Sequence, residues 1–146
     1  MDGSLRPHVL LVDDAPQIRD LFGRFLRQSG MAVTCAADGI FALAEARACV
    51  PDAVVCDLDM PNMDGLALCR ALRDDPATKD VPILVVSGSG ATQSIAALQA
   101  GCDAVLQKPC TGALLVTTIE RLLALPSPRT KPGPVTACPT GGPDTS

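Results

Sequence analysis

Short apolar runs alternate with helical patterns between residues 6 and 125. Five of the runs indicate strands: His8–Val12, Ala32–Ala36, Ala53–Asp57, Ile83–Ser87 and Ala104–Gln107. Several of these runs are apolar at nearly every position, which is typical of parallel strands that helices cover on both faces. The pattern of apolar and polar positions therefore predicts five buried strands.

A helical pattern follows each of these strands. In the first, apolar residues recur three and four positions apart between Ile18 and Leu26, after Pro16 and before Gly30. The next three are expected at about 39–49, from near Asp64 to before Pro76, and at about 92–100 with Gly101 as the C-terminal cap. The last carries Leu115, Thr118, Ile119 and Leu122 on one face. Strict alternation of strand and helix predicts an α/β fold, a doubly wound parallel sheet with right-handed crossovers.

Polar side chains follow four of the predicted strands. Asp13 and Asp14 come after the first, Asp57 ends the third with Asp59 two residues later, Ser87 and Gly88 end the fourth, and Lys108 and Pro109 follow the fifth. In sheets of this kind the ligands bind at the carboxyl ends of the strands. We therefore expect one site at one edge of the sheet.

Neighbouring carboxylates at that edge would repel each other strongly unless a cation lay between them. Oxygen ligands with room for water suit Mg²⁺. Asp57 can then be a nucleophile that forms an acyl phosphate, with the metal and Lys108 compensating the negative charge. The hydroxyl of Ser87 and the following N–H of Gly88 could bind a phosphate oxygen. Each signal alone has an ordinary reading, such as a helix cap, a polar loop or a solvated lysine, and it is their combination that favours a site.

Composition narrows the class of protein. The length of 146 residues fits one domain, and the net charge of −4 argues against binding to nucleic acid. We find no targeting signal and no apolar run of the roughly 20 residues that a membrane helix needs. We expect a soluble, cytoplasmic protein with a domain at residues 1–125. Residues 126–146 contain six prolines and three glycines, which predicts a disordered tail.

Seven cysteines and one histidine could suggest a metal or redox site. The sequence has no C-x-x-C pair, and His8 lies at no metal-ligand spacing from any cysteine. We expect the cysteines to act as small apolar residues of the core. We expect His8 to lie at a strand edge, away from the acidic residues, and not to donate a phosphoryl group.

Over about residues 7–125 the sequence resembles the receiver domains of bacterial two-component systems. The resemblance is carried by Leu10–Asp14, by the run from Asp57 through Met60-Pro61-Asn62-Met63-Asp64-Gly65, by Ser87 and by Lys108-Pro109. It implies the flavodoxin-like strand order 2-1-3-4-5. It also implies that Asp57 accepts a phosphoryl group from a phosphohistidine on a partner kinase or phosphotransfer protein.

The resemblance further assigns roles within the site. It implies that Asp14 is a direct Mg²⁺ ligand, that Asp13 acts mainly through water, and that Asp59 contributes its backbone carbonyl. It implies that Ser87 turns toward the phosphate, that Lys108 pairs with the phosphate, and that the Lys108–Pro109 bond is cis. The sequence departs from the family pattern at Val105 and Cys110, where many members have aromatic residues.

Three functions remain as hypotheses at this point. The first is a phosphorelay module, not an enzyme beyond assisting its own phosphorylation and dephosphorylation, whose output is binding of an unknown downstream protein, expected through the fourth helix, fifth strand and fifth helix. The second is a small phosphatase of the haloacid-dehalogenase kind, because Asp57-Leu58-Asp59, Ser87 and Lys108 could imitate its residue set. The third is a receiver-like scaffold that is not phosphorylated.

Overall fold

The computed structural model describes residues 6–58, 63–88 and 90–124. Asp59 and the predicted tail at 126–146 lie outside these residues. The five strands are β1 (His8–Val12), β2 (Ala32–Ala36), β3 (Ala53–Asp57), β4 (Ile83–Ser87) and β5 (Ala104–Gln107). The helices are α1 (Pro16–Gln28), α2 (Gly39–Ala48), α3 (Gly65–Asp74), α4 (Ala91–Ala100) and α5 (Gly112–Ala124). All five predicted strands are confirmed, and each predicted helix is present.

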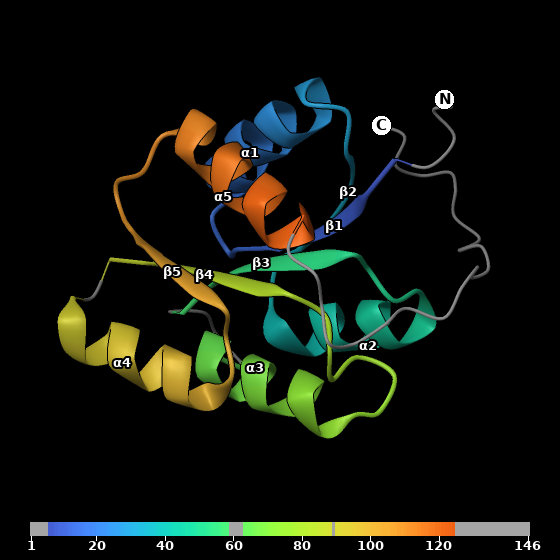
Figure 1. Cartoon of the computed structure of the whole chain (residues 1–146), viewed down its shortest axis with the longest axis vertical. Helices are drawn as coiled ribbons and strands as arrows, with labels where there is room; N and C mark the ends of the chain where they lie inside the picture. The colour runs from blue at the N-terminus through green and yellow to red at the C-terminus, as the bar shows by residue number, and fades with distance from the viewer. Residues whose placement is uncertain (1–5, 59–62, 89, 125–146) are drawn as a thin grey trace.

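The strands form one parallel sheet in the order β2-β1-β3-β4-β5, which confirms the expected flavodoxin-like arrangement. Helices α1 and α5 cover one face, and α2, α3 and α4 cover the other (Figure 1). The register pairs Asp57 with Val86 and Ser87 with Gln107. Because all strands point the same way, their carboxyl ends meet at one edge of the sheet.

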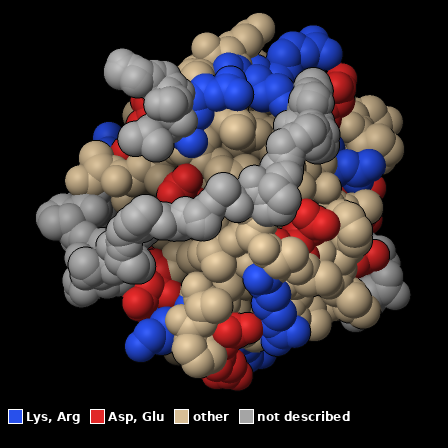
Figure 2. Space-filling model, turned by 90° about the vertical axis from the view of Figure 1, so that its right-hand side faces the viewer, with Lys and Arg blue, Asp and Glu red and all other residues tan. Residues whose placement is uncertain are grey.

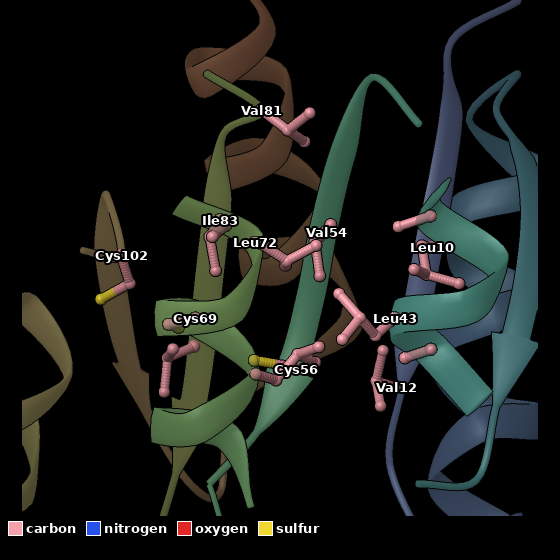
Figure 3. Packing of buried hydrophobic residues seen from close by; sticks show 14 of the residues in the cluster. Leu10, Val12, Leu43, Val54, Cys56, Cys69, Leu72, Val81, Ile83 and Cys102 are labelled. Atoms are coloured by element: carbon pink, nitrogen blue, oxygen red, sulfur yellow. The ribbon is translucent and has the colours of Figure 1, made fainter. Parts of the chain in front are cut away.

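Two apolar clusters fill the space between the sheet and its helices. Val9, Leu11, Val55 and Leu84 pack toward α1 and α5, whereas their neighbours Leu10, Val54 and Ile83 pack toward the other three helices (Figure 3). Successive strand residues point to opposite faces, so a strand that is buried on both faces must be apolar throughout. This accounts for the continuous apolar runs in the sequence.

Most of the described cysteines behave as expected. Cys56, Cys69 and Cys102 are buried and belong to the apolar cluster between the sheet and helices α2, α3 and α4 (Figure 3). Cys35 and Cys110 are half-buried and free. Cys49, at the C-terminal end of α2, differs from the expectation because it is disulfide-bonded.

His8 begins β1, at the amino edge of the sheet, whereas Asp13, Asp14 and Asp57 lie at the carboxyl edge. Its backbone N–H donates to a carboxylate oxygen of Asp52 at 2.7 Å, and its Nε2 lies 2.7 Å from the hydroxyl of Thr34. These contacts join the beginning of β1 to the middle of β2 and to the residue that precedes β3. The expectation that His8 lies at a strand edge, far from the predicted site, is confirmed.

The guanidinium of Arg73, near the end of α3, joins three segments at the amino edge of the sheet. It donates to the carbonyl oxygens of Gly101, Lys79 and Val81 at 2.9, 2.9 and 2.7 Å, and to the Asp103 carboxylate at 2.9 Å. The same carboxylate oxygen accepts the N–H of Ile83 at 2.8 Å. Arg73 therefore fixes the turn after α4 against the start of β4.

Substituting Arg73 by Met is expected to lower the free energy of unfolding by about 2–4 kcal/mol, because several part-buried carbonyls lose a charged donor. Urea denaturation followed by far-ultraviolet circular dichroism measures the change. Arg70→Met is the matched control, since Arg70 is exposed on the same helix, and its effect is expected to stay within about 0.5 kcal/mol. Equal effects of the two substitutions would contradict the role given to Arg73.

The surface carries charges of both signs. On the face shown in Figure 2, acidic and basic side chains alternate across uncharged surface, with basic ones gathered along the upper edge. This mixture agrees with the small net charge of −4. Among the helices in the described part of the chain, none has the length and apolar character needed to cross a membrane.

Candidate functional site

The carboxylate of Asp57 lies at the centre of the candidate site, at the end of β3. The residue is 5% exposed. Gly65 begins α3 directly beside it: a Cβ at Gly65 would lie 2.5 Å from the Asp57 carbonyl oxygen and 2.8 Å from the Leu58 Cα. The N–H of Gly65 donates to the Leu58 carbonyl at 3.0 Å, and Asp64 caps the helix by accepting from Ala67 N–H at 2.9 Å. The Asp-Gly pair thus starts α3 against the backbone at the end of β3.

Asp13 and Asp14 follow β1 on the neighbouring strand end. Asp13 is 3% exposed, and its Oδ1 accepts the N–H of Ala15 at 2.9 Å. Its own N–H donates to the Ala36 carbonyl at 3.1 Å, which continues the ladder with β2 by one residue. Asp14 is exposed. One of the two carboxylates is therefore buried and the other is exposed.

Lys108 reaches the acidic residues from the end of β5. Its Nζ lies 3.3 Å from Asp57 Oδ1 and 3.5 Å from Asp13 Oδ2. Its N–H donates to the Ser87 carbonyl at 2.8 Å, and its bond to Pro109 is cis, as expected. Burial alone would lower the pKa of the Lys108 ammonium, but the carboxylates of Asp13 and Asp57 together raise the pKa above its ordinary value of 10.5. The ammonium is therefore charged at neutral pH.

Ser87 ends β4 at the same edge and is fully buried. Gly88 follows it and is exposed, with a Cβ there lying 3.9 Å from the Lys108 Cβ. The fold thus carries all of the described residues that we predicted for the site to the carboxyl edge of the sheet: Asp13, Asp14, Asp57, Ser87 and Lys108.

Three of these residues form a group that fits a hard divalent cation. One carboxylate oxygen each of Asp13, Asp14 and Asp57 lies within 4.8 Å of the others. Three carboxylates this close repel one another, and among the described residues the Lys108 ammonium compensates part of their charge. Mg²⁺ prefers a few carboxylate oxygens and keeps several waters, which an exposed member such as Asp14 leaves room for. The residues present therefore fit Mg²⁺.

Two contacts beside the site were not anticipated from the sequence. Arg19 Nη1 donates to the Asp13 carbonyl at 2.7 Å, and Gln107 Nε2 donates to the Ser94 hydroxyl at 2.7 Å, joining β5 to α4. The only hint for Arg19 was a basic residue one turn into the helix after the acidic pair.

Val105, which stands where the family often has an aromatic residue, is half-buried against the cluster beneath α4.

The fold and the site together define a doubly wound α/β domain of the chemotaxis-regulator type. The family described as response regulator receiver domain matches residues 9–120. The chain belongs to this family.

Curated relatives include the transcriptional regulatory protein PrrA of Mycobacterium tuberculosis, which is 41% identical over 122 residues, covering 83% of this chain and 52% of that protein. The CseB regulator of Streptomyces coelicolor is 37% identical over 117 residues, covering 80% of this chain and 49% of that protein. The chain spans about half the length of these relatives.

Solved structures agree with this assignment. A response regulator from Chloroflexus aurantiacus has a TM-score of 0.80 at 34% identity, with 83% of this chain and 100% of that chain covered. The receiver domain of the sensor histidine kinase PA1611 from Pseudomonas aeruginosa has a TM-score of 0.78 at 30% identity over 83% of this chain and all of that chain. That structure has a magnesium ion coordinated in the active-site cleft.

Proposed function

We propose that this chain is a phosphoacceptor module of a two-component phosphorelay, in which Asp57 receives a phosphoryl group. The observation that carries the proposal is the group of side chains at the end of β3, where the Asp57 carboxylate lies 3.3 Å from the Lys108 ammonium and beside two further carboxylates. A buried aspartate with a purely structural role would not account for the nearby lysine and the two further carboxylates. A nucleophile that needs a metal ion and a fixed positive charge explains them all.

In the proposed reaction an Oδ atom of Asp57 attacks the phosphorus of a partner's phosphohistidine. A P–O bond forms as the P–N bond breaks, and the electron pair of the P–N bond goes to the imidazole nitrogen. Asp13, Asp14 and Asp57, together with the Asp59 carbonyl according to the resemblance, would hold Mg²⁺, which would compensate negative charge at the phosphoryl oxygens. Lys108 contributes a second positive charge, and Ser87 with the Gly88 N–H binds a remaining oxygen.

The family membership guides the proposed partners and output. The donor is a histidine kinase or a histidine phosphotransfer protein, and the protein works in the cytoplasm. We propose that the domain spans residues 1–125 and that the Pro- and Gly-rich residues 126–146 are not part of it. Output is binding of a downstream protein, biased by the phosphoryl group through a two-state loop and helix. The exposed Ile95 and Leu98 of α4, at 56% and 50% exposure, and Leu114 of α5 offer apolar contact area for such a partner.

Incubation of the purified protein with acetyl phosphate and Mg²⁺, followed by intact mass measurement, tests the proposal. We expect a mass gain of about 80 Da, one phosphoryl group, that hydroxylamine removes and that EDTA prevents. Peptide mapping should locate the adduct on Asp57. Absence of any adduct under all conditions would leave the receiver-like scaffold as the remaining reading. Rapid turnover of small phosphate esters without an adduct would instead favour a phosphatase.

A further inference from the structure

The turn between β1 and α1 carries two of the three proposed metal ligands. Ala15 is the N-cap of α1 and offers no side-chain oxygen to the first helical N–H groups. The turn therefore lacks the side-chain cap that often fixes the start of a helix. Asp13 is held by its Oδ1, which accepts the Ala15 N–H, and by its own N–H, which donates to the Ala36 carbonyl. The carbonyl of Asp13 is a further point at which the turn can be fixed.

The side chain of Arg19 contacts the backbone of this turn and restrains it. Its Nη1 donates to the Asp13 carbonyl at 2.7 Å, a short hydrogen bond with a charged donor. The residue is half-buried, and its own N–H donates to the Ala15 carbonyl at 3.1 Å, which places its side chain one turn beyond the acidic pair. The guanidinium thus bridges the first turn of α1 and the end of β1.

Repulsion in the pocket makes such a restraint necessary. Asp13, Asp14 and Asp57 bring three carboxylate oxygens within 4.8 Å of one another. Lys108 contacts Asp13 and Asp57, whereas Asp14 is exposed. A contact at the Asp13 carbonyl, added to the two that Asp13 already makes, would oppose an outward movement of the β1–α1 turn that separates its carboxylates from Asp57.

We propose that Arg19 is a positioning residue of the divalent-cation site, which presets Asp13 and Asp14 by holding the Asp13 carbonyl. The inference rests on the proposed function, because it concerns the same metal ligands. Residues that orient metal ligands typically change metal affinity about 10–100-fold when they are replaced. We expect the lower end of this range, since the Asp13 carboxylate keeps its bonds to Ala15 and Lys108.

The sign of the effect separates positioning from simple electrostatics. Removing a positive charge near the site would by itself tighten cation binding, because the acidic group would attract the cation more strongly. Removing a positioning contact loosens binding instead. Arg19→Met and Arg19→Gln both delete the charge, whereas Arg19→Lys keeps it and retains a donor on a shorter side chain.

The experiment is titration of Mn²⁺ into the unphosphorylated protein, with free Mn²⁺ followed by electron paramagnetic resonance, and of Mg²⁺ by calorimetry. The chain has no Trp or Tyr, so a method that does not use their fluorescence is needed. We expect the dissociation constant to rise about 10-fold in Arg19→Met and Arg19→Gln, with partial recovery in Arg19→Lys. Arg24→Met is the matched control, because Arg24 lies on the same helix in an exposed pair with Asp20 at 3.0 Å, and it should bind like the unaltered protein.

Unchanged or tighter binding in folded Arg19→Met and Arg19→Gln would overturn the inference. Thermal unfolding in EDTA is measured in parallel, because a purely structural role would lower stability and leave the affinity of the folded protein unchanged. If the neutral variants do not fold, Arg19→Lys decides the question. Weaker metal binding than in the unaltered protein supports the inference, and unchanged binding overturns it. Metal affinity is measured without phosphorylation, so a missing phosphoryl adduct would overturn the proposed function alone.

Discussion

Replacing Asp57 by Asn is expected to abolish the phosphoryl adduct and, at the same time, to stabilise the metal-free protein. The adduct is lost because the amide is no nucleophile toward phosphorus. Stability rises by about 1–2 kcal/mol, because one of three mutually repelling carboxylates loses its charge while Lys108 keeps Asp13 as a partner. Intact mass after acetyl phosphate treatment and urea denaturation in EDTA measure the two effects.

A surface aspartate gives the matched control for this substitution. Asp20 pairs with Arg24 at the surface, with its side chain 72% exposed, so Asp20→Asn should leave both the adduct and the stability nearly unchanged. With saturating Mg²⁺ the stability gain of Asp57→Asn should vanish or reverse. The unaltered protein keeps all three proposed carboxylate ligands, binds the cation more tightly and is therefore stabilised more by it. An adduct that survives Asp57→Asn would refute Asp57 as the phosphoacceptor.

Replacing Lys108 by Met is expected to lower the stability of the metal-free protein, which Asp57→Asn raises. Like Asp57→Asn, it is expected to impair phosphorylation. In EDTA the free energy of unfolding should fall by roughly 2–3 kcal/mol, because the buried carboxylates of Asp13 and Asp57 lose their ammonium partner; the side chain of Lys108 is 30% exposed, which limits the loss. The initial rate of phosphorylation from acetyl phosphate should fall about 10²–10³-fold. Lys79→Met, at an exposed position, is the control.

The stabilising effect of Lys108 should depend on pH in a defined direction. Although burial opposes it, Asp13 and Asp57 raise the pKa of Lys108 above 10.5. A raised pKa in the folded state gives stability that is complete below about pH 10.5 and is lost as the pH rises through the folded-state pKa. The stability difference between the unaltered protein and Lys108→Met should therefore be constant from about pH 7 to about pH 9 and shrink above about pH 10.5.

A double-mutant cycle connects the two substitutions. If Lys108 stabilises the protein through Asp57 as well as Asp13, Lys108→Met should destabilise the Asp57→Asn background less than it destabilises the unaltered protein. Additive effects would show that the 3.3 Å contact contributes nothing measurable to stability.

The strands and helices could be predicted from the sequence because the apolar pattern of each one is visible in neighbouring residues. Val9–Val12, Val54–Cys56 and Ile83–Val86 are apolar at every position because both faces of their strands are covered. Turn and cap residues such as Pro16 and Gly101 then placed the helix ends within a residue or two. The family motifs added the strand order, and the cis Lys108–Pro109 bond was expected on the same ground.

Side-chain contacts between distant segments were beyond that reasoning. The four hydrogen bonds of Arg73 join residues that are up to 30 positions apart, and an arginine late in a helix gives no sign of its acceptors. The disulfide bond of Cys49 was not expected, because the spacing of cysteines alone does not show which of them lie outside the core. Arg19 was missed for the reason that its acceptor is a backbone carbonyl, which every residue has.

What the sequence by itself determined is the alternation of buried strands and amphipathic helices, and the polar residues that end four of the strands, since both are properties of neighbouring positions. Only the tertiary structure decided how those residues meet: the 3.3 Å and 3.5 Å contacts of Lys108, the buried Asp13 beside the exposed Asp14, and the close approach of Gly65 to the Asp57 backbone. The physical reason is that these contacts depend on strand order and register, which bring residues from distant parts of the chain to one edge of the sheet.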